Sequence, residues 1–280
     1  MATLTTITMR MMTAMRMTTT ITVMIMRMST GIGTIMVMPT TMGIAMATGM
    51  GDPPPLLRLL AWMSPSFPTG AFSYSHGLEM AVEDGAVRDP ATLRAYVETA
   101  LASGAGRCDG AFLALAWRAA VAGDMPTLCA TAERAAAMRG SSELALESLS
   151  QGRAFLSTAR AAWPCDGLGT TAAALEAAGI EVAHPVAVAL VGAAWSVPLD
   201  DLLLGHLHAF AANLVSAGIR LVPLGQTDGQ RVLAALEAPL RAAAARAAAI
   251  GGLDDVASAA PAIDLLSIRH ETQYTRLFRS

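Results

Sequence analysis

This 280-residue sequence predicts an all-α protein, a single globular domain of about eight to ten packed helices preceded by a leader. Three observations predict this fold. Apolar residues recur at helical spacing over most of residues 53–280, several periodic stretches begin with a capping residue, and no alternating strand of convincing length occurs. This part of the chain is long enough to bury one large core, near the upper size of a single domain.

Residues 1–52 form a Met/Thr-rich leader. Fourteen of the eighteen Met residues lie in the first fifty positions, mixed with Thr, Ile, Gly and three Arg. A transit peptide, a signal sequence and a membrane anchor each share part of this composition. However, Thr and Gly interrupt every apolar stretch, whereas a membrane-spanning helix needs about 20 predominantly apolar residues. We therefore expect a disordered leader that ends at the three prolines of positions 53–55.

The chain must break after Trp62, because Pro65 and Pro68 cannot continue a helix and the sequence Pro68-Thr69-Gly70 favours a turn. The residues that follow place aromatic rings and polar groups at the start of a new helix. These residues are Phe72, Tyr74, His76 and Glu79. Such a set suits a partner surface, and the alternative is a tight interhelix loop with an aromatic plug.

The next helices have clear start and stop signals. Asp89 can cap a helix whose first turn holds Pro90. Its apolar stripe consists of Leu93, Tyr96, Val97, Ala100 and Leu101. Asp109 and Asp124 predict two further starts, with Gly123 as a stop between them. A helical run over residues 142–163 should end at Pro164.

Helices over about residues 185–195 and 199–217 are nearly all apolar, which predicts a central position surrounded by other helices. Polar residues interrupt them, and the apolar run before Pro198 is too short to span a membrane. An Ala-rich helix over about residues 230–249 and a terminal helix from about residue 263 complete the set.

The histidines and cysteines do not indicate a metal cage. His206 and His208 could suggest nickel, but two residues apart on a helix they point about 200° away from each other. His206 shares an apolar stripe with Phe210, which favours a buried, hydrogen-bonded ring, and His184 is expected at a helix start. The three cysteines are widely spaced, as expected for small side chains in a reducing cytoplasm.

Composition and motifs argue against an enzyme and against nucleic-acid binding. The net charge is −3, without the basic excess of a nucleic-acid-binding protein. The chain has no Lys, so the loop at residues 225–230 cannot be a phosphate-binding loop of the usual kind. The zinc motif that begins at His270 has Tyr274 in place of its second histidine, and Ser73 stands where a nucleophile elbow needs Gly.

Three segments, residues 64–79, 223–231 and 269–280, resemble the UreF family of urease accessory proteins, and the resemblance covers roughly residues 56–280. It implies a non-catalytic cytoplasmic scaffold that forms homodimers, binds UreD (also called UreH) and recruits the GTPase UreG to apo-urease. It further implies a nickel- and GTP-dependent pathway, no stably bound cofactor and no membrane or nucleic-acid partner. The alternative is a direct nickel-binding metallochaperone, which would need clustered ligands.

The resemblance places candidate partner-binding residues in all three segments. They are Pro68, Gly70, Phe72, Ser73, Tyr74, His76, Gly77, Glu79, Gln226, Asp228, Gln230, Arg231, His270, Gln273, Tyr274, Arg276, Leu277 and Phe278. On a helical projection one face of the last segment holds His270, Tyr274, Leu277 and Phe278, and the other holds Arg269, Gln273 and Arg276. We therefore expect a helical docking element whose removal affects assembly more than stability.

The leader has one further explanation. If residues 17–22 are encoded ATG-ACC-ACC-ACC-ATC-ACC, the frame one base earlier encodes His-Asp-His-His-His-His. That peptide resembles the His-rich tail of the nickel chaperone UreE, whose gene often precedes that of UreF. The hypothesis is that residues 1–52 are out-of-frame translation of the neighbouring gene.

Overall fold

The computed structural model describes residues 3–11, 17–25 and 55–280, which belong to two separate units, Met1–Gly51 and Asp52–Ser280. In the first unit, strands β1 (Thr3–Met11) and β2 (Met17–Ile25) pair antiparallel, with Thr3 opposite Ile25 and Met11 opposite Met17. The sequence predicts no convincing strand here, but the many β-branched Thr and Ile residues favour extended backbone. The remaining leader residues lie outside the described ranges, and the out-of-frame origin stays a hypothesis.

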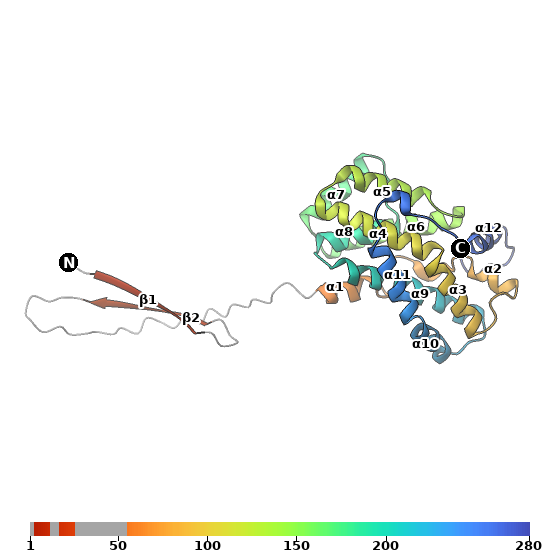
Figure 1. Cartoon of the computed structure of the whole chain (residues 1–280), viewed down its shortest axis with the longest axis horizontal. Helices are drawn as coiled ribbons and strands as arrows, with labels where there is room; N and C mark the ends of the chain where they lie inside the picture. Colours follow the sequence, from red (N-terminus) through yellow and green to blue (C-terminus); the bar gives the residue numbers. More distant parts are fainter. Residues whose placement is uncertain (1–2, 12–16, 26–54) are drawn as a thin grey trace, which may run out of the picture. The chain divides into compact units, whose positions relative to one another are not determined.

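The second unit is helical throughout its regular structure, which confirms the all-α class (Figure 1). Its described residues form twelve α-helices, more than the eight to ten expected, and two short 3₁₀ helices. The α-helices are α1 (Pro55–Trp62), α2 (Leu78–Glu83), α3 (Pro90–Ala102), α4 (Ala105–Ala122), α5 (Met125–Ala137), α6 (Ser142–Ala162), α7 (Asp166–Ala177), α8 (His184–Ala194), α9 (Leu199–Leu221), α10 (Gln226–Ala235), α11 (Glu237–Ala248) and α12 (Pro261–His270). The 3₁₀ helices are η1 (Ala71–Ser73) and η2 (Leu253–Asp255).

Helices α4, α8 and α9 form the centre of this unit. α4 packs against α3, α5, α8, α9 and α11, and α8 also packs against α6 and α7. Residues 185–192 of α8 are all buried, as its nearly continuous apolar sequence predicted. The central position expected for the two most apolar helices is therefore confirmed.

Within the described residues, α9 is the one helix whose length and composition would allow it to cross a membrane. Half of its most apolar window is buried inside the unit. Leu202, Leu203 and Leu207 are fully buried, and the helix packs against α3, α4, α10 and α11. These contacts are those of a core helix.

Two of the predicted helix starts are confirmed and one is wrong. The Asp89 carboxylate accepts a hydrogen bond from the Thr92 amide at 2.8 Å and caps α3, and Asp124 caps α5 in the same way. Asp109 lies inside α4 rather than at a helix start. Its carboxylate forms a 2.7 Å ion pair with Arg139, a distant partner that local sequence does not reveal.

The Ala-rich segment expected as one helix is two, because α10 ends at Ala235 and α11 begins at Glu237. Pro239 explains the break: in a continuous helix its ring would clash with the carbonyl of Ala235, and it has no amide to donate. In the first turn of α11 the same residue is tolerated, since that turn leaves its amides unpaired.

Candidate partner-binding site

Two of the three predicted segments meet in space. The loop of residues 71–79 lies against the tail of residues 271–280, and together they form what we call the tail–loop junction. The Arg279 amide donates to the Ser73 carbonyl at 2.8 Å, and the Ser75 amide donates to the Ser280 carbonyl at 2.9 Å. The two segments therefore share backbone hydrogen bonds, although Ser75 and Ser280 are 205 positions apart in the sequence.

The loop reaches this position through left-handed backbone. Gly70, His76 and Gly77 all have positive φ, and for His76 the value is 60°. Such a conformation is uncommon for a residue with a side chain. The His76 carbonyl accepts a 2.8 Å hydrogen bond from the Tyr96 hydroxyl, which fixes the turn. A Cβ atom at Gly77 would lie 3.0 Å from the Ser267 amide nitrogen, so glycine also permits the close approach of α12.

Glu79 is the central polar residue of the junction. Its buried carboxylate accepts hydrogen bonds from the Leu277 amide at 2.6 Å and the Phe278 amide at 2.9 Å, and it lies 3.1 Å from Nε2 of His270. Glu79 thus supplies hydrogen-bond acceptors for two backbone amides of the tail, which lies beyond the end of α12.

His270 connects two carboxylates. Its ring is fully buried, with Nε2 facing Glu79 and Nδ1 at 2.6 Å from Oε2 of Glu143. An ionised carboxylate can only accept, so each contact is a hydrogen bond when the ring nitrogen that faces the carboxylate carries a proton. Glu143 also pairs with Arg276 at 2.7 Å, which places a positive group beside the two acids.

Ser280 lies at a second buried polar cluster. Its carbonyl accepts hydrogen bonds from the Ser75 amide and hydroxyl, and its own hydroxyl donates to Oε2 of Glu147 at 2.8 Å. The His76 amide donates to the same Ser280 hydroxyl at 3.3 Å, and Nδ1 of His76 lies 3.7 Å from Glu147. Loop, tail and α6 are therefore joined through buried polar groups.

The tail is not the predicted helix. α12 ends at His270. Of the four residues predicted to share one face, His270 and Phe278 are buried, whereas Tyr274 and Leu277 are exposed, so the four residues do not form one face. The physical reason is that the amides of residues 277–279 donate to Glu79 and to the Ser73 carbonyl. They are consequently not available for i−4 bonds within a helix.

The aromatic residues of the loop have different positions. Tyr74 is buried, with 3% of its surface exposed, as the plug interpretation predicted, whereas Phe72 is 65% exposed. The Arg220 guanidinium carbon lies 3.6 Å from the Phe72 ring centroid and 4.3 Å from that of Phe278. Arg220 also donates to the Phe72 carbonyl at 2.9 Å. This cation–π contact joins the loop ring to a tail ring.

The third predicted segment forms the start of α10. Gln226, Gln230 and Arg231 are exposed, and Asp228 is half-buried. Asp228 accepts from the Gly225 amide at 3.4 Å, as a helix-capping residue does, and it pairs with Arg231 at 2.8 Å. Both contacts stay within the segment.

The remaining candidates divide by exposure. Pro68, Gly70 and Arg276 are exposed, Ser73 and Gln273 are half-buried, and His76 and Gly77 are buried. The buried residues hold the junction in place, whereas the exposed residues are available to another molecule.

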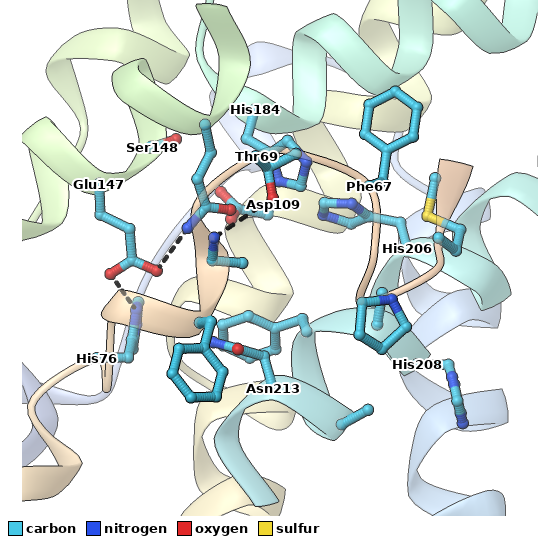
Figure 2. Close-up of a pocket in the computed structure, with 18 of the residues that line it drawn as sticks. Phe67, Thr69, His76, Asp109, Glu147, Ser148, His184, His206, His208 and Asn213 are labelled. Atoms are coloured by element: carbon cyan, nitrogen blue, oxygen red, sulfur yellow. Dashed lines mark hydrogen bonds and ion pairs between the residues drawn. The ribbon is translucent and has the colours of Figure 1, made fainter. Parts of the chain in front are cut away.

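A cavity of about 230 Å³ lies beside the junction, and sequence reasoning missed it. Four of the five histidines line it, namely His76, His184, His206 and His208 (Figure 2). They come from the loop, α8 and α9, so no sequence spacing groups them. Among the described residues, no group of three or more His, Cys, Asp or Glu side chains is arranged to hold a metal ion.

His206 is buried as predicted, with 3% of its surface exposed, but its Nδ1 has no hydrogen-bond partner. Burial lowers the pKa of His206, and burial together with the neighbouring His206 and Arg139 lowers the pKa of His184 well below its usual value. Both rings are therefore neutral at pH 7.

Comparison with known proteins identifies relatives over most of the chain. The UreF family model matches residues 87–237. A urease accessory protein UreF from Bradyrhizobium sp. (strain ORS 278) is 53% identical over 237 residues, covering 85% of this chain and 97% of the relative. A protein of the same name from Rhodopseudomonas palustris (strain TIE-1) is 54% identical over 225 residues, covering 80% of this chain and 92% of the relative. Another from Granulibacter bethesdensis is 51% identical over 225 residues, covering 80% of this chain and 94% of the relative.

Proposed function

This chain belongs to the UreF family of urease accessory proteins, and we propose that it acts as an adaptor in nickel insertion into urease. In this role it binds UreD (UreH), recruits the GTPase UreG to apo-urease and supports GTP-dependent nickel delivery. It works in the cytoplasm as a homodimer within the complex, with no stably bound cofactor and no membrane or nucleic-acid partner. As an accessory protein it is not itself an enzyme.

The observation that carries this proposal is the attachment of the tail to the loop by Glu79. Because the buried carboxylate holds the amides of Leu277 and Phe278, the tail has a defined backbone position before any partner binds. A preorganised surface loses less conformational entropy on binding than a free tail would. The junction therefore suits protein recognition.

The exposed residues of the junction fit a protein partner. Phe72, Tyr274 and Leu277 present large apolar groups to solvent, although residues of this kind are usually buried. Aromatic side chains and Arg are enriched at the centres of interfaces, and Arg220 lies directly over the Phe72 ring. We assign UreD to this surface, and to the exposed start of α10, with Gln226, Gln230 and Arg231, we assign UreG.

The test is co-purification of the full chain with UreD, UreG and apo-urease. The double variant Phe72→Ala/Leu277→Ala should retain its helical circular dichroism but bind UreD at least tenfold more weakly, because it removes exposed apolar area and leaves the buried contacts in place. Val121→Ala on α4 is the matched control, since Val121 is also an exposed apolar residue. Unchanged UreD binding and normal urease activation by the double variant would contradict the assignment.

A further inference from the structure

Buried polar atoms without a hydrogen-bond partner gather at the cavity beside the junction. In the part of the chain that the structure describes, five such atoms belong to residues that line this cavity. They are Nε1 of Trp62, Nδ1 of His76, Nη2 of Arg139, Oγ of Ser148 and Nδ1 of His206. Buried polar atoms normally have partners, so five of them around one cavity indicate an occupant that forms hydrogen bonds.

Arg139 carries the strongest donor of this group. Its side chain is only 7% exposed, Nη1 donates to Asp109 at 2.7 Å and Nε donates to the Ala135 carbonyl at 3.0 Å, which leaves Nη2 without an acceptor. A guanidinium has no acceptor atom, and the indole N–H of Trp62 likewise can only donate. The occupant must therefore carry an acceptor, such as a carbonyl oxygen.

The other unpaired atoms can accept hydrogen bonds. Burial lowers the pKa of His206, so the ring is neutral, and its Nδ1 accepts when the proton lies on Nε2. The hydroxyl of Ser148, which is also buried, has lone pairs that accept. An occupant that carries N–H donors as well as an acceptor oxygen satisfies both kinds of group.

The charges of the cavity favour an uncharged occupant. Its charged lining residues are Asp109, Glu147 and Arg139, which leave a net negative charge that opposes an anion. These charges already have partners, because Asp109 pairs with Arg139 and Glu147 accepts from the Ser280 hydroxyl at 2.8 Å and from Nε2 of Gln151 at 3.1 Å. Moving an ion out of water costs far more than moving a neutral polar molecule.

The cavity opens to solvent and has aromatic as well as polar walls. Its lining includes Phe72, which is exposed, so a small molecule can enter. Figure 2 shows Phe67 and His206 on one side of the cavity and His76 on the other. The volume of about 230 Å³ exceeds the roughly 150 Å³ that hold benzene in an engineered cavity. An amide is planar, so it can lie against an aromatic ring while its edge reaches polar groups.

We propose that this cavity binds a small uncharged molecule of the primary amide or urea type. The carbonyl oxygen accepts from Arg139, and the N–H groups donate to Ser148 and His206. This inference goes beyond the proposed adaptor function and does not depend on it, because the site requires no partner protein.

The test compares three probes of similar shape that differ in charge and in donors. Acetamide has a carbonyl oxygen and N–H groups, acetone lacks the N–H groups, and acetate is an anion. Each is titrated into the wild-type full chain while NMR records the ring resonances of His76 and His206, with His270, which does not line the cavity, as the reference. We expect saturable shifts at His76 and His206, and at least about tenfold tighter binding of acetamide than of acetone or acetate.

Three results of this titration would overturn the proposal. Tighter binding of acetate would identify an anion site, and equal binding of acetamide and acetone would remove the role of the N–H groups. The third result is the absence of a saturable shift with any probe, which would show that water alone occupies the cavity. This comparison needs no substitution, so it does not depend on the folding of a variant.

A matched pair of serines on α6 then tests the position of the ligand. Ser148→Ala removes an unpaired group of the cavity and should weaken acetamide binding roughly two- to tenfold, the loss expected for one neutral hydrogen bond. Ser157→Ala is the control, because Ser157 is exposed on the same helix and does not line this cavity. Equal affinity in the wild type and both variants would place acetamide elsewhere and contradict the proposal.

Discussion

The carboxylate of Glu79 lies 3.1 Å from Nε2 of His270, although the two residues are 191 positions apart. Glu79 stands in the first turn of α2 and His270 is the last residue of α12, and these two helices pack against each other. The contact is buried, so it cannot be replaced by water without opening the junction. It is one of several contacts that join the two sequence motifs that first suggested the family.

Replacing Glu79 should release the tail. In Glu79→Ala the amides of Leu277 and Phe278 lose their acceptor, and each buried unpaired group costs about 1–3 kcal/mol. We expect a lower free energy of unfolding in urea and faster hydrogen exchange at both amides. Glu98→Ala is the control, because Glu98 pairs with Arg94 on an exposed helix face, and such pairs contribute about 0.3–0.5 kcal/mol. Equal effects of the two substitutions would show that the Glu79 contacts are not stabilising.

Deletion of residues 269–280 should lower stability as well as partner binding. The sequence alone predicted an effect mainly on assembly, but the structure buries Phe278 and Ser280 and places Glu79, Glu143 and Glu147 against the tail. Without the tail Glu79 loses the Leu277 and Phe278 amides, Glu143 loses His270 and Arg276, and Glu147 loses the Ser280 hydroxyl, which leaves buried carboxylates with fewer partners. We expect a clear decrease in the midpoint of thermal unfolding. A truncated protein that unfolds at the wild-type temperature would contradict the described tail contacts.

Tyr74 should affect the fold more than partner binding. Its ring is buried, so Tyr74→Ala leaves a cavity, and truncation of a buried aromatic residue costs about 3–5 kcal/mol. Tyr74→Phe keeps the ring and should cost less than about 1 kcal/mol. Chemical denaturation of both variants measures the difference. If Tyr74→Ala unfolds like wild type but fails to bind UreD, Tyr74 contacts the partner directly.

Two glycines on different helices should respond in opposite directions to alanine. A Cβ atom at Gly152 of α6 would lie 2.1 Å from the Val182 carbonyl oxygen, so Gly152→Ala must displace the segment before α8 and should cost about 1–3 kcal/mol or more. Gly169 of α7 has nothing within 4 Å of the same position. Gly169→Ala should therefore stabilise the protein by about 0.5–1 kcal/mol through helix propensity. Equilibrium unfolding of the two variants tests both signs.

Stability should fall as the pH drops below about 6.5. Burial lowers the pKa of His184 and of His206 in the folded state, so below this pH the unfolded chain takes up protons that the folded chain does not. The free energy of unfolding then decreases until the pH reaches the lowered values. His206→Gln should flatten this slope and His208→Gln should not, as measured by urea unfolding between about pH 5 and 8. An unchanged slope in His206→Gln would contradict the neutral, buried state of the ring.

Sequence patterns are sufficient where the stabilising partner is a near neighbour. Asp89 caps α3 through Thr92, three residues away, and this start is correctly predicted. Asp109 carries the same local signal, but its partner Arg139 lies 30 residues away and keeps it inside α4. A single-residue propensity cannot distinguish these two cases.

The same reasoning explains the errors in the candidate site. The periodicity of residues 270–278 is compatible with a helix, and only the presence of Glu79 beside the backbone reveals that the amides are bound elsewhere. The cavity was not predictable for a similar reason. His184 and His206 approach each other because α8 packs on α9, and nothing in the spacing of the two residues indicates that contact.

The pairing of loop and tail also determines when the tail–loop junction can form during synthesis of the chain. Ser75 and its acceptor Ser280 are 205 residues apart. At about 5–20 residues per second, a ribosome needs roughly 10 to 40 s to make the intervening chain, and through that time the loop has no tail to pair with. A chain released before residues 271–280 are made would thus contain most of the helices but not the tail–loop junction, so this surface can form only after those residues have been synthesised.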